Sequence, residues 1–582
     1  MTRPVTEHFF LTHDQESLFY RHFPAQTSQR RGVIVLFHRG HEHSARMTHL
    51  VDELNLPDFD FFAWDARGHG RSPGMRGYSP SFGTSVRDVQ TFMAHICQQY
   101  GVAMEDIYVI AQSVGAVLVS TWVHDYAPKI RGMSLASPAF DVKLYVPFAK
   151  EGLALMHRIR GLFFVNSYVK AKFLTHDAER ITSYDSDPLI TRPIAVNILL
   201  GLYQAARRVV SDAQAITTPT QLLISADDWV VKHKPQHQFY ERLSSPMKSK
   251  HMLSGFFHDT LGEKDRHIAV NAIRVFIDEV FSQPAYVADL QRADHYGYTA
   301  DESRELAAEL PKWSLRGIYW RLTRMGLKIG GLFSTGIKLG HDTGFDSGST
   351  LDYVYRNKPT GKNALGRIID QQYLNSPGWR GIRQRKIHVE ELLKTAIRHI
   401  NAKDQAVHVL DIAAGHGRYI LDGVQAADAP VQSITLRDYS DINVRDGQNM
   451  IQARGLSDIA QFIQADAFDT ASIASTQPVP NVAVVSGLYE LFSDNDMLRA
   501  SLTGLAQAIP SGGYLIYTGQ PWHPQLELIA RALTSHRQGQ AWVMRRRTQA
   551  EMDQLVEHAG FKKITQRIDE EGIFTVSLAQ RI

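Results

Sequence analysis

The sequence has one cysteine, Cys97, in 582 residues, so it cannot form a disulfide bond within the chain. A chain of this size without disulfides is typical of a reducing compartment, and we expect a cytoplasmic protein. Polar and charged residues interrupt the first segment, MTRPVTEHFFLTHDQES, so we expect no secretory signal. The longest apolar runs, at 33–37 and 116–123, fall well short of the roughly 20 residues that span a bilayer, so we expect no transmembrane helix.

An excess of one charge is also missing. The 63 Lys and Arg residues nearly balance the 60 Asp and Glu residues, for a net charge of +3. This is too little for a protein whose main task is to neutralise phosphates, so we expect no nucleic-acid partner. Hydrophobic residues, at 44%, suffice for large buried cores, and the length suits several small domains or two large ones.

Short β-branched and aromatic runs alternate with helical patterns in two parts of the chain, which predicts two doubly wound α/β domains with largely parallel sheets. We expect buried strands in the first part at 33–37, 60–64, 106–113, 132–137 and 220–225. The corresponding runs in the second part lie at 408–413, 433–438, 461–466, 482–487 and 513–519. The expected domains are 1–283 and 346–582.

The segment 284–345 between these domains is basic and apolar at once. No acid occurs between residues 311 and 341, whereas six cations do: Lys312, Arg316, Arg321, Arg324, Lys328 and Lys338. Aromatic and aliphatic residues are interleaved with them. This pattern suits an amphipathic helix on an anionic lipid surface, which would place the protein peripherally at the inner membrane face through 312–338. Glycines after Met325 weaken a long helix, and the alternative is an ordinary linker docked between the domains.

Residues 106–119, DIYVIAQSVGAVLV, combine a buried strand, a tight turn and the start of an apolar helix. A serine nucleophile held in such a strained turn needs small residues two positions before and after it. Ala111 and Gly115 meet this requirement around Ser113. The motif predicts a nucleophile elbow, although a small-x-Ser-x-Gly pattern alone is common in proteins without this function.

Two further residues strengthen the interpretation. Asp228 follows the strand at 220–225, and His258 lies further along the chain, so that the order Ser113, Asp228, His258 matches that of α/β-hydrolases. In that chemistry the histidine takes the serine proton, the carboxylate orients the imidazole, and the serine attacks an acyl carbonyl. The alternatives are a turn-forming aspartate and a surface histidine.

The segment 36–46, LFHRGHEHSAR, follows the first strong strand, where a backbone donor for an oxyanion is expected. The N–H groups of Gly40 and Val114 would form the pair. The segment also carries three histidines, His38, His41 and His43. We do not expect a metal site, because no cysteine is nearby and serine hydrolysis requires no metal.

Together, the segments at 36–46, 61–77, 111–116, 226–231 and 256–266 resemble the α/β-hydrolase branch of monoacylglycerol lipases and bacterial lysophospholipases. The resemblance covers about residues 8–283. It implies a small acyl-ester substrate, such as a monoacylglycerol or lysophospholipid, and a cap at about 139–213. It also assigns the aspartate role to Asp228 rather than Asp227. Arg39 and His41 stand where this family usually has glycine.

In the second part, the run VHVLDIAAGHGR at 407–418 predicts a strand, an acid and a Gly415-x-Gly417 turn into a helix. Asp438 closes the next strand, at the spacing from which a carboxylate binds a ribose diol. Asp466 closes the third strand. The pattern favours a nucleotide cofactor over a plain strand-to-helix turn. NAD is the weaker alternative, because Ile420 occupies the position of the third glycine.

Residues 385–582 resemble class I methyltransferases that use S-adenosylmethionine. The resemblance implies this cofactor and a Rossmann-like fold. It implies a cofactor site formed by Asp411, Ala413, Gly415, Gly417, Asp438, Asp466, Ala467 and Ser486. Asp438 would bind the ribose, and Asp466 with Ala467 would contact the adenine. Ser486 belongs to the fourth motif, at 485–496.

The methyl acceptor is not indicated by any motif. Tyr489, Glu490 and His523 are candidates for a base or an orienting group, or else for structural residues. We therefore predict a bifunctional enzyme, a serine acyl-ester hydrolase fused to an S-adenosylmethionine-dependent methyltransferase. The alternative is an active hydrolase whose second half senses S-adenosylmethionine or serves as a scaffold.

Overall fold

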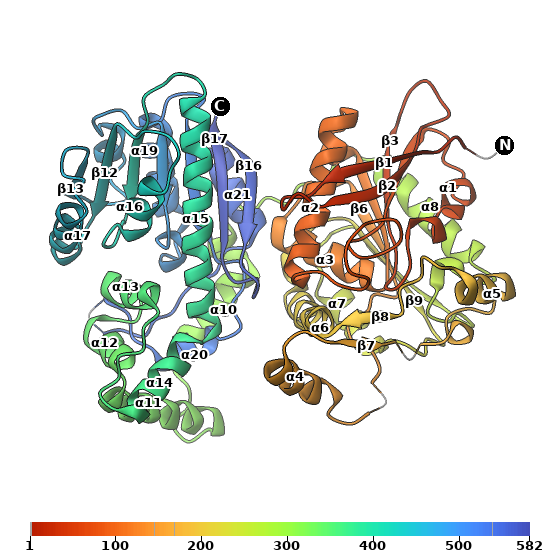
Figure 1. The fold of residues 1–582 in the computed structure, drawn as a ribbon, viewed down its shortest axis with the longest axis horizontal. Coiled ribbons are helices and arrows are strands. Elements are labelled where there is room, and N and C mark those ends of the chain that lie inside the picture. Colours follow the sequence, from red (N-terminus) through yellow and green to blue (C-terminus); the bar gives the residue numbers. More distant parts are fainter. Residues whose placement is uncertain (1–2, 145, 168, 538) are drawn as a thin grey trace. The chain divides into compact units, whose positions relative to one another are not determined.

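The computed structural model describes residues 3–144, 146–167, 169–537 and 539–582. The chain divides into two compact units, Met1–Ala288 and Asp289–Ile582 (Figure 1). Each unit is built on its own sheet covered by helices, which confirms the predicted pair of α/β domains. Most of the expected connecting segment, from Asp289 onward, belongs to the second unit.

The sheet of the first unit has the strand order β1-β2-β4-β3-β5-β6-β9-β10. Strand β2 is antiparallel to both of its neighbours, and the other pairs are parallel. The strands are β1 (Thr6–Leu11), β2 (Ser17–Phe23), β3 (Gly32–Phe37), β4 (Phe59–Trp64), β5 (Ile107–Gln112), β6 (Gly132–Ala136), β9 (Thr220–Ser225) and β10 (Lys248–Leu253). The helices that cover it are α1 (His49–Glu53), α2 (Phe82–Tyr100), α3 (Val114–Tyr126), α7 (His233–Arg242) and α8 (His267–Phe281).

All five strands expected in this unit are present and buried along their whole length. The sequence predicts these strands because a strand covered on both faces is apolar at nearly every position. The three strands not foreseen lie at or near the edges. Strands β1 and β10 alternate between exposed and partly buried residues, and their charged positions conceal them in the sequence.

The chain between β6 and β9 leaves the sheet and forms an additional layer. Its elements are α4 (Ala149–Arg160), β7 (Phe164–Asn166), α5 (Ala178–Ser186), β8 (Pro193–Ala195) and α6 (Val196–Ser211). Strands β7 and β8 pair with each other in a separate two-stranded sheet. This is the segment expected to form a cap.

The sheet of the second unit has the strand order β13-β12-β11-β14-β15-β17-β16. Its strands are β11 (His408–Ile412), β12 (Ser433–Asp438), β13 (Ala460–Gln464), β14 (Val482–Val485), β15 (Tyr514–Gly519), β16 (Phe561–Ile568) and β17 (Thr575–Arg581). The five expected strands are parallel to one another, and the unforeseen β17 pairs antiparallel with β15 and β16. Helices α16 (Arg418–Gln425), α17 (Asp441–Ala453), α18 (Thr470–Ala474), α19 (Asn495–Ala508), α20 (Leu526–Ala532) and α21 (Gln549–His558) follow or connect the strands.

Within the second unit, the helices α9 to α15 precede this sheet in the chain (Figure 1, green). They are α9 (Ala293–Tyr296), α10 (Tyr298–Ala307), α11 (Leu315–Phe333), α12 (Thr335–Thr343), α13 (Gly348–Arg356), α14 (Ala364–Leu374) and α15 (Pro377–Asn401). Helix α15 packs against the sheet, whereas α11 packs against α12, α14 and α20. Among the described residues, no helix combines the length and the apolar character needed to cross a bilayer.

Candidate functional site

Ser113 lies in the turn between β5 and α3, where the backbone has φ 56° and ψ −116°. This positive φ is strained for a residue with a side chain, and such strain is typical of functional turns. Gly115 makes the turn possible, because a Cβ atom at this position would lie 2.4 Å from the carbonyl oxygen of His38. The packing thus explains why the sequence has a glycine two residues after the serine.

The three residues expected to act together converge at this turn. Ser113 Oγ lies 2.7 Å from His258 Nε2, and His258 Nδ1 lies 2.7 Å from Asp228 Oδ2. The second carboxylate oxygen of Asp228 accepts hydrogen bonds from the N–H groups of Val230 and Val231, at 2.7 and 3.0 Å. All three side chains are buried.

The electrostatics keep Asp228 ionised. Burial alone would raise the pKa of this carboxyl, but His258 and the two backbone amides outweigh it and hold the pKa below its ordinary value. A carboxylate fixed in this way selects the imidazole tautomer that leaves Nε2 facing the serine. The arrangement can remove the proton from Ser113 Oγ and offset the charge that then develops on the imidazole.

Gly40 lies beside this turn, where an ideal Cβ would be 3.0 Å from Val114 Cγ2. The two side chains that stand where the resembled family has glycine are bonded to other groups. The Arg39 guanidinium lies 2.7 Å from Glu42 Oε1, and His41 Nδ1 lies 2.6 Å from the carbonyl oxygen of Thr191. Burial alone would lower the pKa of Arg39, but Glu42 and Asp259 outweigh it and raise the pKa of the guanidinium.

Three residues that the sequence did not single out support His258. Gln112 donates through Nε2 to the carbonyl oxygen of His258, at 3.2 Å, and to Asp259 Oδ1, at 3.1 Å. Arg180 of α5 forms an ion pair with Asp259 at 2.9 Å, linking the cap to the histidine loop. Asp259 could have been predicted as a supporting residue, because it follows His258 directly in the sequence. Nothing in the sequence indicates the role of Arg180.

The histidines at 36–46 do not form a common cluster, because each has a different partner. His38 Nε2 accepts from the N–H group of Ala66 at 3.0 Å, and His43 Nε2 lies 2.9 Å from Asp187 Oδ2. Burial lowers the pKa values of His38 and His41, which favours the neutral imidazoles. Their contacts join the loop to β4 and to the cap.

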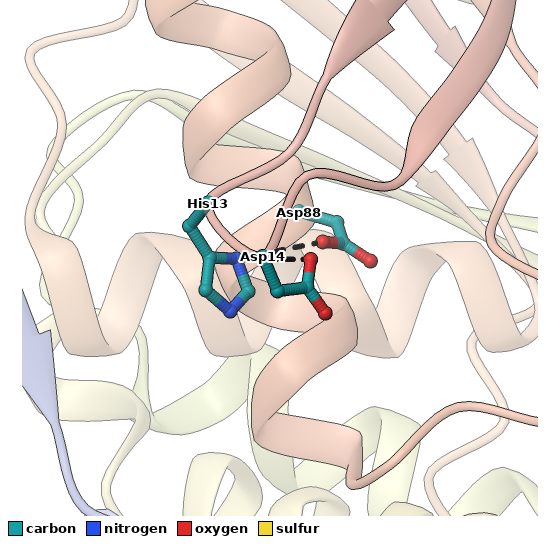
Figure 2. Close-up of side chains that lie close together, drawn as sticks. All are labelled: His13, Asp14 and Asp88. Atoms are coloured by element: carbon teal, nitrogen blue, oxygen red, sulfur yellow. Dashed lines mark ion pairs between the residues drawn. The ribbon is translucent and has the colours of Figure 1, made fainter.

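Among the described residues, one group has the spacing of metal ligands, namely His13, Asp14 and Asp88 (Figure 2). The Arg67 guanidinium binds both carboxylates, with Nη2 at 2.8 Å from Asp14 Oδ1 and at 2.8 Å from Asp88 Oδ1. A cation from the chain therefore already neutralises this pair. We interpret the group as an ion-pair cluster that joins the β1–β2 turn to α2.

In the second unit, the chain turns sharply after β11. Ala413, Gly415 and Gly417 have φ values of 57°, 58° and 73°. A Cβ at Gly417 would lie 2.4 Å from Leu436 Cδ1, so glycine is needed for α16 to pack on β12. A Cβ at Gly415 would meet only the Cα atom of Gly348, at 3.8 Å, which leaves backbone open to a ligand.

Asp438, at the end of β12, is bonded to this turn. Its Oδ2 accepts from the N–H group of Gly415 at 2.9 Å, and its Oδ1 accepts from the N–H group of Ser440 at 2.9 Å. Asp411 is fully buried and interacts with the Tyr419 hydroxyl and the N–H group of Ile412, but among the described residues neither of its carboxylate oxygens has a hydrogen bond of good geometry. Burial raises the pKa of Asp411 well above its ordinary value, and nearby Asp438 adds to this effect.

The other expected cofactor residues lie at the same edge of the sheet. Ser486 follows β14 directly. Asp466 and Ala467 lie just beyond β13, which ends at Gln464 rather than at Asp466. The exposed Asp466 side chain accepts a hydrogen bond from the N–H group of Phe468 at 2.9 Å. The carboxyl ends of parallel strands are where such sheets bind ligands, so the buried Asp411 carboxyl, Asp438 and the open glycine turn fit a nucleotide cofactor.

The three residues considered for the methyl acceptor differ in their surroundings. The Tyr489 hydroxyl donates to Ser501 Oγ at 3.0 Å inside the core. Glu490 and His523 instead line a cavity of about 140 Å³. Its wall is mainly aromatic and aliphatic and comes from α11, α13, α15, α20 and the loops after β14 and β15.

Comparison with known proteins gives two family matches. Residues 273–581 match the family described as "Putative methyltransferase", and residues 28–265 match "Serine aminopeptidase, S33". The chain is 58% identical to "Uncharacterized protein YnbC" of Escherichia coli, over 99% of this chain and 98% of that protein.

Lipases are among the relatives of the first unit. The monoglyceride lipase of Homo sapiens is 26% identical, covering 42% of this chain and 80% of its own length. The crystal structure of the Paleococcus ferrophilus monoacylglycerol lipase matches with a TM-score of 0.41 and 24% identity, covering 46% of this chain and 98% of that one. By its family match and its sequence relatives, the first unit is an α/β hydrolase related to monoglyceride lipases.

Proposed function

Because the chain belongs to the methyltransferase family that matches residues 273–581 and carries an α/β hydrolase before it, we propose that it is a bifunctional enzyme. The first unit would hydrolyse small acyl esters of the monoacylglycerol or lysophospholipid class. The second would transfer a methyl group from S-adenosylmethionine. The observation that carries the proposal is the hydrogen-bonded chain from Ser113 through His258 to Asp228.

In the hydrolase half, His258 Nε2 takes the proton of Ser113 as its oxygen attacks the ester carbonyl. The N–H groups of Gly40 and Val114 would receive the negative charge that develops on the carbonyl oxygen. His258 then returns its proton to the leaving alcohol, and water releases the acyl group from the serine by the reverse sequence. Asp228 keeps the imidazole oriented in both stages.

Fluorophosphonate labelling of the full chain tests the hydrolase. We expect Ser113→Ala to abolish labelling and ester hydrolysis, while Ser120→Ala, a buried serine of α3, leaves both intact. p-Nitrophenyl esters of graded chain length, with aminoacyl p-nitroanilides beside them, distinguish an esterase from an aminopeptidase. Labelling that survives in Ser113→Ala would refute the assigned nucleophile, and cleavage of the anilides alone would refute the ester substrate.

In the methyltransferase half, Asp438 would bind the cofactor ribose, and Gly415 and Gly417 would let the backbone approach the cofactor. S-adenosylmethionine would supply an activated methyl group, and the protein's task is to position the acceptor in line with it. We expect S-adenosylhomocysteine to bind the full chain in calorimetric titration. Asp438→Ala should weaken this binding, whereas Asp441→Ala, an exposed neighbour, should not. Binding without methyl transfer to any acceptor would favour the sensing or scaffolding alternative.

We further propose that α11 contacts an anionic membrane surface. Its inner face is anchored, with Trp320 Nε1 donating to Glu527 Oε1 at 3.0 Å. Its outer face carries apolar side chains at helical spacing that are 51–88% exposed, namely Leu315, Tyr319, Leu322, Met325, Ile329 and Leu332. Arg321 and Lys328 flank this stripe. A helix that is apolar on its solvent side and bordered by cations matches an anionic lipid interface.

Vesicle flotation tests this contact. The chain should bind vesicles of phosphatidylserine and phosphatidylcholine more strongly than phosphatidylcholine alone. Replacing both Leu322 and Ile329 with Gln should weaken binding more than tenfold, because a buried aliphatic side chain contributes roughly 1.5–3 kcal/mol. The control Ile368→Gln changes an exposed residue of α14. Salt-independent binding, or a dimer that the double variant disrupts, would contradict a lipid partner.

A further inference from the structure

Helix α13 contacts both the glycine turn after β11 and the cavity of the second unit. Gly348, the first residue of this helix, lies against Gly415, and Leu351, one turn later, lines the cavity. Gly487, two residues past the end of β14, lines it as well. Since β14 pairs with β11, the cavity opens beside the edge of the sheet where the cofactor residues gather. It therefore has the position of an acceptor site.

The cavity is small and its wall is rich in rings. Its volume is about 140 Å³, and its lining includes Tyr373, Trp379, Trp542 and Phe574. An apolar protein cavity of about 150 Å³ binds benzene, so this space accommodates one aromatic ring with few substituents. Aromatic walls favour a planar ligand, because stacked and edge-to-face rings attract one another.

Buried polar atoms in the wall have no hydrogen-bond partner in the described part of the chain. Glu490 Oε2 is such an acceptor, and Gln520 Nε2 and Trp542 Nε1 are such donors. All three side chains are at least nine-tenths buried. Leaving buried polar groups unpaired costs stability, so the cavity is built for a ligand that carries both a donor and an acceptor.

Glu490 is held in place while one oxygen remains available. Its Oε1 accepts a hydrogen bond from Thr518 Oγ1 at 2.7 Å and lies 3.7 Å from Arg385 Nη1. His523 differs, because burial lowers its pKa to about 3 and its Nδ1 already accepts from the N–H group of Gln525 at 3.0 Å. The proton of this neutral imidazole is then on Nε2, which can donate but not accept. The other carboxylate of the wall, Asp346, accepts hydrogen bonds from Ser535 Oγ and the N–H group of His536, at 2.6 Å each, so among the described lining residues Glu490 Oε2 is the carboxylate oxygen open to a ligand proton.

We propose that this cavity binds a single-ring phenol, and that Glu490 accepts the phenol proton as the ring oxygen is methylated. The inference rests on the proposed methyltransferase function and names its acceptor class. The O–H bond breaks and its proton passes to Glu490 Oε2. The oxygen lone pair forms the new bond to the methyl carbon, and the carbon–sulfur bond of the methyl donor breaks with its electron pair left on sulfur. The products are an aryl methyl ether, S-adenosylhomocysteine and a proton that Glu490 releases to water.

The binding test uses the full chain saturated with S-adenosylhomocysteine, and measures the Kd of phenol by ligand-observed NMR. Phenol should bind, anisole should bind more weakly because it has no proton to donate, and 1-octanol should not compete. Leu528→Trp fills the cavity and should raise the Kd of phenol at least tenfold, with the Kd of S-adenosylhomocysteine within twofold of wild type. Leu365→Trp, an exposed leucine of α14 outside the cavity, should change neither value.

The role of Glu490 has a separate kinetic test. Glu490→Gln keeps an oxygen acceptor but cannot take a proton, so methyl transfer to phenol should fall by about 10²–10⁴ at neutral pH. The rate of this variant should recover as the pH approaches about 10, where a phenol ionises by itself. A residue with only a structural role would give no such recovery.

The outcomes of these tests distinguish a wrong acceptor class from a wrong methyltransferase assignment. If S-adenosylhomocysteine binds but phenol does not, or if Leu528→Trp leaves phenol binding unchanged, the acceptor class is wrong and the cofactor assignment stands. If S-adenosylhomocysteine itself does not bind the wild-type chain, the methyltransferase function and the inference fall together. If phenol is methylated equally fast by Glu490→Gln at every pH, the proton acceptor is another group.

Discussion

The two candidate sites differ in how their buried polar groups are satisfied. Around the serine turn, the side chains of Ser113, His258 and Asp228 are all hydrogen-bonded to one another or to backbone amides. In the second unit, Glu490 Oε2, Gln520 Nε2 and Trp542 Nε1 have no hydrogen-bond partner among the described residues. The three catalytic candidates of the first site are bonded within the chain, whereas the second site contains buried polar groups left open to a ligand.

This difference fits the chemistry proposed for each site. A serine hydrolase forms its nucleophile from its own side chains, so preorganisation before substrate arrives lowers the barrier. A site that binds two small molecules must instead leave donors and acceptors open, and each open group costs stability until it is paired. Stability should therefore be intrinsic to the first site and depend on ligand at the second.

The largest effect is expected when the hydrogen-bonded chain from Ser113 through His258 to Asp228 is disrupted. Asp228→Asn preserves the shape of the side chain but no longer selects the imidazole tautomer that accepts the serine proton. A comparable change in a serine protease lowers kcat about 10⁴-fold, and we expect a loss of this size in p-nitrophenyl ester hydrolysis. The control is Asp227→Asn, one residue earlier. Equal losses in both variants would show that Asp228 has no special role.

A second prediction concerns the buried ion pairs of Glu42, which lies two residues after Gly40. Glu42 Oε1 binds Arg39 at 2.7 Å and Arg46 at 3.1 Å, with all three side chains buried. Glu42→Gln would leave two buried guanidinium groups undercompensated, and breaking a buried pair costs about 3–5 kcal/mol. We expect the free energy of unfolding of the first unit, measured by hydrogen exchange of β3–β5, to fall by this amount.

The matched control for this change is Glu53→Gln, which removes a partly exposed partner of Arg266. Exposed ion pairs contribute about 0–1 kcal/mol, so this variant should stay close to wild type. If the two variants have equal stability, the Arg39 network does not hold the loop that carries Gly40.

The sequence predicted the centres of both sheets, and the reason is physical. Strands such as β5 and β14 are buried on both faces, so their apolar runs are unambiguous. Edge strands such as β16 bury only part of their surface, and their mixed pattern resembles that of a loop. Long-range pairing, such as that of β17 with β15, leaves no local signal.

The same distinction applies to the sites. Ser113 and Gly415 lie in strand-to-helix turns whose local geometry demands particular residues, and a motif can therefore indicate them. Arg180 and the wall of the cavity meet their partners only after distant helices pack, so spacing along the chain carries no information about them. The sequence thus indicated candidates for the reacting groups more readily than the residues that contact and support them.

The smallest expected effect tests whether the second site depends on its ligand. A molecule that binds only the folded state stabilises it by about 2.7 kcal/mol at a concentration 100 times its Kd. S-adenosylhomocysteine at that concentration should slow hydrogen exchange in β11, β12 and α16 by about 100-fold. Segments β5 and α3 of the first unit should be unaffected, because they contribute no residue to the proposed cofactor site. A fluorophosphonate should give the opposite pattern, and equal protection of both units by either ligand would contradict the contrast between a self-contained site and a ligand-dependent one.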